Sequence, residues 1–113
     1  MIHKVLTLCF LLSQVSFVMG SENYGIAVHG GAGVMKNLSE NQKQKIEEQI
    51  TKTLTEAYKI IEQGGTSMDA VEFAVSEFED SPLFNAGRGS VYNSEEVQEM
   101  DASIMSGQNR SAG

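Results

Sequence analysis

The chain has few of the residues that cross-link small domains or bind nucleic acids. Its 113 residues include one cysteine, one proline and no tryptophan. A single cysteine excludes an internal disulfide framework. There are 15 Asp+Glu against 8 Lys+Arg, which gives a formal net charge of -7. Because phosphates are bound by clustered Lys and Arg, we expect no nucleic-acid partner and no binding to an acidic membrane surface.

Long apolar runs are also missing, apart from one near the N-terminus. There, Lys4 precedes an apolar stretch from Val5 to Leu12, which the polar Ser13 and Gln14 interrupt. The stretch is shorter than the about 20 residues of a membrane span, and a charged start before a short apolar core is typical of a signal peptide. We therefore predict a signal peptide at 1–20, a domain at 21–113, and a secreted or periplasmic protein. A buried amphipathic first helix is the alternative.

Two tripeptides match the acceptor sequence for N-glycosylation. They are Asn37-Leu38-Ser39 and Asn109-Arg110-Ser111. Such tripeptides arise by chance and have a meaning only in a eukaryotic secretory pathway.

The apolar pattern predicts two amphipathic helices flanked by short strands. Tyr24–Val28 is β-prone and runs into a glycine-rich loop. Apolar residues at helical spacing follow Ser39 as far as Gly64-Gly65, and a second such pattern begins at Thr66. Two further short strands are expected at Ser90–Tyr92 and Met100–Met105. The result is an α/β layer structure whose three strands are too few to cover both helices.

The glycine-rich loop His29–Gly33 admits three interpretations. A dinucleotide-binding fingerprint would need another glycine where Lys36 stands. An esterase-type oxyanion hole would need a Gly-x-Ser-x-Gly element, which the sequence lacks. The third interpretation is structural, because glycines let a backbone pass close to another segment or to a substrate.

Nucleophiles and metal ligands are scarce. His29 is the only histidine beyond the predicted signal peptide, so the sequence does not supply a zinc site. The acidic residues between Glu95 and Asp101 are an alternative site for a hard cation, although a solvated turn explains them equally well. A hydroxyl nucleophile needs an adjacent base. The threonines beyond the signal peptide are expected on or at the start of helices, in solubilising or capping roles: Thr51, Thr53, Thr55 and Thr66.

Several segments carry motifs that occur together in one protein family. They are Tyr24–Gly33 (YGIAVHGGAG), Gly64-Gly65 with Asp69-Ala70-Val71, Asp80–Ser90 (DSPLFNAGRGS) and Glu99–Met105 (EMDASIM). Together they resemble the N-terminal region of the isoaspartyl peptidase/L-asparaginases, the plant-type asparaginases of the N-terminal nucleophile (Ntn) hydrolases. The resemblance implies a partial αββα sandwich. It also implies a precursor that cuts itself, so that a β subunit begins with the nucleophilic threonine and this chain corresponds to the early α subunit.

The resemblance assigns roles to two loops. Four residues are expected near the nucleophile or in self-processing: His29, Gly30, Gly31 and Asn85. A structural sodium ion is expected to be held by the main-chain carbonyls of Phe78, Glu79, Ser81, Phe84, Ala86 and Arg88. No cofactor is implied for catalysis. The catalytic threonine itself is expected beyond Gly113, so this chain alone is expected to be inactive.

The implied activity is hydrolysis of L-asparagine to L-aspartate and ammonia, together with cleavage of β-aspartyl (isoaspartyl) peptides. The expected partners are the β subunit and a second αβ unit. The chain departs from the family at Met105-Ser106-Gly107, where Met-Asp-Gly is common. A truncated, inactive secreted isoform that acts by binding a partner is the alternative.

Overall fold

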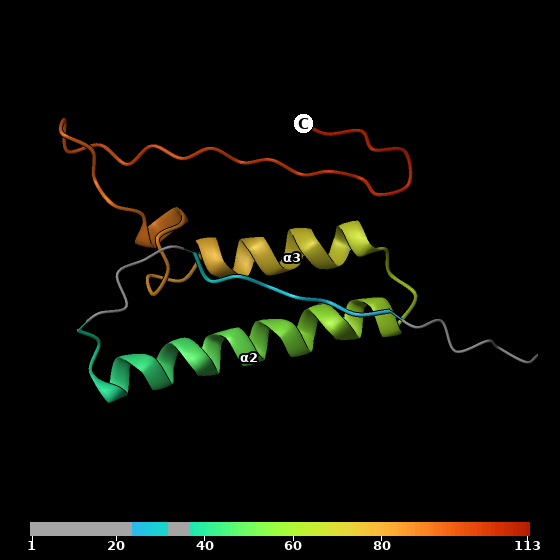
Figure 1. Cartoon of the computed structure of the whole chain (residues 1–113), viewed down its shortest axis with the longest axis horizontal. Helices are drawn as coiled ribbons and strands as arrows, with labels where there is room; N and C mark the ends of the chain where they lie inside the picture. The colour runs from blue at the N-terminus through green and yellow to red at the C-terminus, as the bar shows by residue number, and fades with distance from the viewer. Residues whose placement is uncertain (1–23, 32–36) are drawn as a thin grey trace, which may run out of the picture.

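A computed structural model describes residues 24–31 and 37–113 as a helical hairpin with extended segments beside it (Figure 1). The predicted signal peptide and Ala32-Gly33 of the glycine-rich loop lie outside these residues. The elements are α2 (Glu40–Glu62), α3 (Ser67–Glu79) and a 3₁₀ turn, η1 (Gly87–Gly89). The two helices confirm the prediction made from apolar spacing. Neither is long and apolar enough to cross a membrane.

Each helix begins with a capping box. Before α2, Gln42 N donates to Ser39 Oγ at 3.3 Å and Ser39 N donates to Gln42 Oε1 at 2.9 Å. Before α3, Asp69 N donates to Thr66 Oγ1 at 3.1 Å, while Thr66 N donates to Asp69 Oδ2 at 2.8 Å. Both boxes satisfy backbone N–H groups that have no partner inside the helix. They therefore fix where the two helices start.

The turn between the helices depends on a glycine pair. Gly64 has a φ of 87°, and its N–H donates to Ile61 O at 3.0 Å. The N–H of Gly65 donates to Ile60 O at 2.9 Å. These two bonds and the left-handed glycine form a Schellman motif, which ends α2. The chain then reverses, and α3 packs antiparallel to α2 (Figure 1).

Small side chains line the contact between the helices. Ala57 of α2 and Ala70 and Ala74 of α3 are buried and form the core cluster. Thr53 is also fully buried, and its Oγ1 accepts a hydrogen bond from Gln49 Nε2 at 3.2 Å. The expectation of a solubilising or capping role for Thr53 is therefore wrong. Thr53 lies one turn before Ala57, so the same stripe of the helix carries both into the core.

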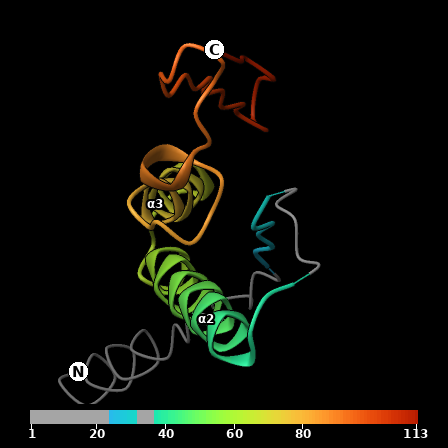
Figure 2. The same ribbon diagram turned by 90° about the vertical axis from the view of Figure 1, so that its left-hand side faces the viewer.

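The Tyr24–Gly31 segment follows the helical hairpin along one side (Figures 1 and 2). Ile26 and Val28 pack against the alanine cluster. At the start of the segment, the ring of Tyr24 lies 5.4 Å from that of Tyr58, centroid to centroid. Desolvation beside Tyr58 raises the pKa of Tyr24 above its ordinary value. Apolar contacts therefore hold this segment beside the helices.

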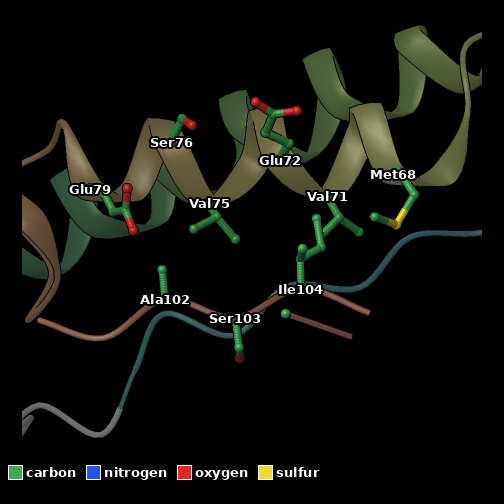
Figure 3. A pocket seen from close by; sticks show the side chains of 10 residues that line it. Met68, Val71, Glu72, Val75, Ser76, Glu79, Ala102, Ser103 and Ile104 are labelled. Carbon is green, nitrogen blue, oxygen red and sulfur yellow. The ribbon is translucent and has the colours of Figure 1, made fainter. Parts of the chain in front are cut away.

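The segment from Met100 onward follows the other side of α3. Ala102 and Ile104 point toward Val71 and Val75, whereas Ser103 points away (Figure 3). This alternation is the side-chain pattern of extended chain. The chain then turns back, so that Ile104 and Gly113 exchange backbone hydrogen bonds of 2.9 and 3.1 Å. An isolated bridge joins Met105 and Ala112.

The strands predicted at Tyr24–Val28, Ser90–Tyr92 and Met100–Met105 are not formed within residues 24–31 and 37–113. A strand requires a continuous ladder with a neighbour. At the second of these positions the backbone bonds to side chains instead, since Gln98 Nε2 donates to Ser90 O at 2.6 Å and Val91 N donates to Asn85 Oδ1 at 3.0 Å. The α/β layer structure is thus present only as its helical layer.

The start of α3 should depend on pH through Asp69. Hydrogen bonds from the Thr66 hydroxyl and backbone N–H lower the pKa of this carboxyl below its ordinary value. A lowered folded-state pKa means that the cap stabilises α3 above about pH 4, the ordinary Asp range, and that this stabilisation is lost as pH falls through the folded-state pKa. An NMR titration of Asp69 should show the lowered value, and Thr66→Ala should raise it.

The matched control is Ser67→Ala, which leaves both partners of the capping box in place. It should leave the Asp69 titration unchanged. An Asp69 pKa that is the same with and without the Thr66 hydroxyl would contradict the assigned cap.

Candidate active site

The two loops with assigned roles meet at one end of the helical hairpin. The segment Phe78–Ser90 folds over the C-terminal end of α3, where the Tyr24–Gly31 segment also arrives (Figure 1). A Cβ on Gly30 would lie 3.0 Å from Phe84 Cε1 and 3.6 Å from Ile50 Cδ1. Because a Cβ at 3.0 Å would force the ring to shift, glycine lets the backbone lie against Phe84. The Phe84 ring packs on Phe78 with centroids 4.5 Å apart.

The His29 side chain makes its hydrogen bond within its own loop. It is exposed, and its Nδ1 accepts a hydrogen bond from Gly31 N at 3.1 Å. A neutral imidazole that accepts at Nδ1 carries its proton on Nε2. Gly31 has a φ of 90°, a conformation that favours glycine. The histidine therefore shapes the turn of the glycine-rich loop, and no hydroxyl of the described residues bonds to it.

Two more glycines close the second loop on itself. Gly87 has a φ of 47°, and a Cβ there would overlap the carbonyl of Glu79. A Cβ on Gly89 would overlap the carbonyl of Phe84. Hydrogen bonds then complete η1, with Gly89 N donating to Ala86 O at 2.9 Å and Ser90 Oγ to Gly87 O at 2.8 Å. The loop is held by backbone contacts that larger residues would block.

The carbonyls of this loop suit a hard cation. Those of Phe78 and Ala86 accept backbone hydrogen bonds, from Ser81 N and Gly89 N respectively. Within the described residues, the other four carbonyls accept none: Glu79, Ser81, Phe84 and Arg88. Sodium and similar hard ions prefer oxygen ligands, and uncharged carbonyls serve as well as carboxylates. Four of the six carbonyls that the resemblance implies are therefore unused by hydrogen bonds among the described residues.

Asn85 lies at the edge of a hollow of 280 Å³. Its Oδ1 accepts the 3.0 Å bond from Val91 N, which caps the turn after η1. The hollow also borders on Ala86, Gly87 and Ser90 and on the acidic Glu79, Glu99 and Asp101. It combines main-chain groups, one side-chain amide and negative charge, so it can orient a small polar ligand.

Most charged side chains around the site are exposed, and Glu79 is half-buried. Arg88 Nε lies 3.4 Å from Asp80 Oδ1, and the two side chains are 75% and 77% exposed. Such a pair contributes little to stability in water. No group of three metal-ligating side chains occurs within the described ranges. Glu99 accepts a 2.7 Å bond from Asn93 Nδ2, in the acidic turn that was considered for a cation.

None of the hydroxyls in the described chain has the environment of a nucleophile. Thr53 is in the helical core, Thr66 caps α3, and Thr55 Oγ1 donates to Thr51 O at 2.8 Å. Thr51 is exposed on α2, and Ser103 points away from α3 (Figure 3). Activation requires a base within hydrogen-bonding distance of the attacking oxygen. Among these groups only Thr66 has one, because its Oγ1 donates to Asp69 Oδ2 at 2.7 Å, and both side chains are used in the capping box of α3.

Sequence reasoning missed two contacts that build the site. Phe84 was expected to contribute only its main-chain carbonyl to the sodium site, yet its ring also packs against the backbone of Gly30. Gln98 was not singled out, although its side chain holds Ser90 O. Glycines in a β-prone run signal that another segment approaches closely, but the sequence does not identify Phe84 as that segment. The Gln98 contact spans eight residues and has no sequence signature.

Known proteins are similar to this chain over most of its length. An isoaspartyl peptidase/L-asparaginase from Mus musculus is 50% identical over 88 residues, which cover 78% of this chain and 26% of that protein. The Homo sapiens protein of the same name is 44% identical over 88 residues, covering 78% and 28%. The chain thus spans about a quarter of the length of these relatives. They confirm the predicted resemblance to isoaspartyl peptidase/L-asparaginases.

The sequence profile of the asparaginase family matches residues 22–113. This match includes α2, α3, η1 and both loops of the candidate site. The chain therefore belongs to the asparaginase family.

Proposed function

We propose that this chain is the N-terminal part of a threonine-dependent amidohydrolase that hydrolyses L-asparagine to L-aspartate and ammonia and cleaves β-aspartyl peptides. The contact of Gly30 with Phe84 carries the proposal, because it joins the two loops to which the resemblance assigns roles, and both loops lie within the family match. The relatives are named isoaspartyl peptidase/L-asparaginases, which supports these substrates. The family match begins at residue 22, which supports a leader at 1–20 and export.

The proposed chemistry needs a nucleophile that these 113 residues do not supply. A threonine freed by self-cleavage attacks the substrate amide carbon through its hydroxyl, and its own α-amine takes the proton. The tetrahedral intermediate then breaks its C–N bond and expels ammonia or an amine, which takes the proton from the α-amine. The acyl-enzyme that remains is hydrolysed by water. The two helices form one layer of an αββα sandwich completed by the β subunit, and the αβ units dimerise. The loops here orient substrate and support the cleavage site.

Activity can be tested in a chimera in which this chain replaces the matched segment of the mouse relative. The chimera should cut itself into two fragments and release ammonia from asparagine or amino acid from a β-aspartyl dipeptide. The 113-residue chain alone should do neither, for want of an activated hydroxyl. Ammonia release by the isolated chain above a buffer blank, or a folded and processed chimera inert toward both substrates, would overturn the proposal.

Asn85→Ala in the chimera should lower turnover or self-processing by about tenfold or more, equivalent to about 1.4 kcal/mol, while the free energy of unfolding changes less. The amide lines the hollow, and its Nδ2 has no hydrogen-bonding partner among the described residues. Steady-state rates at matched folded concentration provide the measurement.

Asn85→Asp is the matched variant, because it keeps an oxygen to accept from Val91 N, while it replaces the amide N–H₂ donor with a second oxygen and a negative charge. It should retain the stability of the loop and still lose activity. Full activity in Asn85→Asp would show that Asn85 only caps the turn.

We also propose a structural sodium ion at the carbonyls of Phe78, Glu79, Ser81, Phe84, Ala86 and Arg88. An ion that binds only the folded state stabilises it by mass action. Exchanging sodium for a bulky organic cation at equal ionic strength should lower the melting temperature of the chimera by about 2–4 °C for each kcal/mol of binding energy lost. An unchanged melting temperature would count against the ion.

Gly87→Ala should destabilise the chimera by about 1–3 kcal/mol and abolish its response to sodium, since a Cβ would push against Glu79 O from a positive φ. Chemical unfolding with and without sodium measures both effects. Two variants separate the causes. Gly64→Ala has a positive φ but open space around its Cβ, and Gly107→Ala has neither strain nor contact. Both should keep the sodium response.

A further inference from the structure

The tip of the C-terminal hairpin has a feature that hydrolysis does not use. After Met105 the chain turns at Ser106–Ser111, where Ser106 N donates to Ser111 O and Arg110 N donates to Ser106 O, both at 2.9 Å. Arg110 has a φ of 59°, in the left-handed region. The turn therefore has one defined conformation, and all of its residues except Ser106 are exposed.

Within this turn, Asn109 and Ser111 are joined by two hydrogen bonds. Ser111 N donates to Asn109 Oδ1 at 3.0 Å, and Ser111 Oγ donates to the same oxygen at 2.7 Å. Both donors fix the orientation of the side-chain amide. Its Nδ2 makes no hydrogen bond to any described residue, and the Asn109 side chain faces solvent. The hydroxyl and the amide of an Asn-x-Ser acceptor are thus brought together on an exposed turn.

The second acceptor tripeptide, at Asn37, differs in its hydroxyl. Ser39 Oγ donates to Gln42 Oε1 at 3.0 Å and accepts from Gln42 N at 3.3 Å, so it belongs to the cap of α2. Both arrangements depend on residues two or three apart, so they can form before the rest of the chain folds. At Asn109, the hydroxyl of Ser111 donates to the side chain of its own asparagine. At Asn37, the hydroxyl of Ser39 is used in the cap of α2 instead.

We propose that Asn109 is an N-glycosylation site and that Asn37 is not. In the transfer, Nδ2 of Asn109 attacks the anomeric carbon of an oligosaccharide carried on a polyisoprenyl diphosphate. The new C–N bond replaces the C–O bond to phosphate, the diphosphate leaves with the electron pair, and Nδ2 gives up one proton to solvent or base. No oxidation or reduction is involved. The proposal rests on the export proposed above and is independent of hydrolysis.

The position of Asn109 is compatible with the candidate active site. Ala102 lies beside Glu79 at the C-terminal end of α3, whereas Ile104 lies beside Met68 near its start (Figure 3). The Ser106–Ser111 turn therefore lies at the N-terminal end of α3, opposite the end that carries Asn85 (Figure 1). With 13 residues, α3 separates these ends by about 20 Å. A glycan on Asn109 would leave the hollow at Asn85 open.

The test uses residues 1–113 joined to the remaining length of the mouse relative and expressed in eukaryotic cells. Total cell extract and medium are treated with peptide N-glycosidase and compared by gel mobility and peptide mass. Compared with the unaltered chimera, Asn109→Gln and Ser111→Ala should each lose one glycan. Ser111→Thr, which keeps the hydroxyl, and Asn37→Gln should lose none. The treated wild-type peptide should contain Asp at position 109.

A second version carries a proven secretion leader in place of residues 1–20. If only this version is glycosylated at Asn109, the site is supported and the proposed export signal is rejected. If the version with the proven leader reaches the medium without a glycan at Asn109, or if Asn37→Gln removes the glycan, the proposal is overturned. Hydrolysis is assayed separately, so an inactive but glycosylated chimera rejects only the proposed activity.

Discussion

The close contact of α2 and α3 at three alanines is the constraint on which the candidate site depends. Ala57, Ala70 and Ala74 are buried where larger side chains would hold the helices apart. The contact fixes the position of α3 beside α2. The last turn of α3 carries Phe78, and the ring centroids of Phe78 and Phe84 lie 4.5 Å apart. Phe84 then supports Gly30. A chain of apolar contacts thus leads from the helical seam to the loop expected beside the nucleophile.

The site is defined by backbone more than by side chains. Gly30 lies against a ring, and Gly87 and Gly89 lie against the carbonyls of Glu79 and Phe84. Main-chain groups positioned in this way resist substitution because the whole loop would have to move to admit a Cβ. They also need no unusual charge. This explains why the described part of the chain displays a structured site around which most charges are exposed and only Glu79 is half-buried.

Local signals in the sequence predicted the helices well. Ser39 and Thr66, which precede the two apolar patterns, form capping boxes with Gln42 and Asp69, and Gly64-Gly65 ends α2. All of these contacts lie within five residues, so the sequence nearby determines them. The burial of Thr53 was not predictable from residue type. It followed from its place one turn before Ala57 and required knowledge of which stripe faces α3.

The strands and the meeting of the two loops could not be predicted in the same way. Strand pairing and the contact of Gly30 with Phe84 join residues far apart in sequence, and such contacts depend on the fold as a whole. Ala102 and Ile104 alternate with Ser103 as a strand would, and Ile26 and Val28 contact the same helical layer. Val71 of α3 borders both segments yet is 44% exposed. The described residues therefore contain a helical layer without a sheet, and the family resemblance, carried by the loops, identified the chemistry that the helices alone do not indicate.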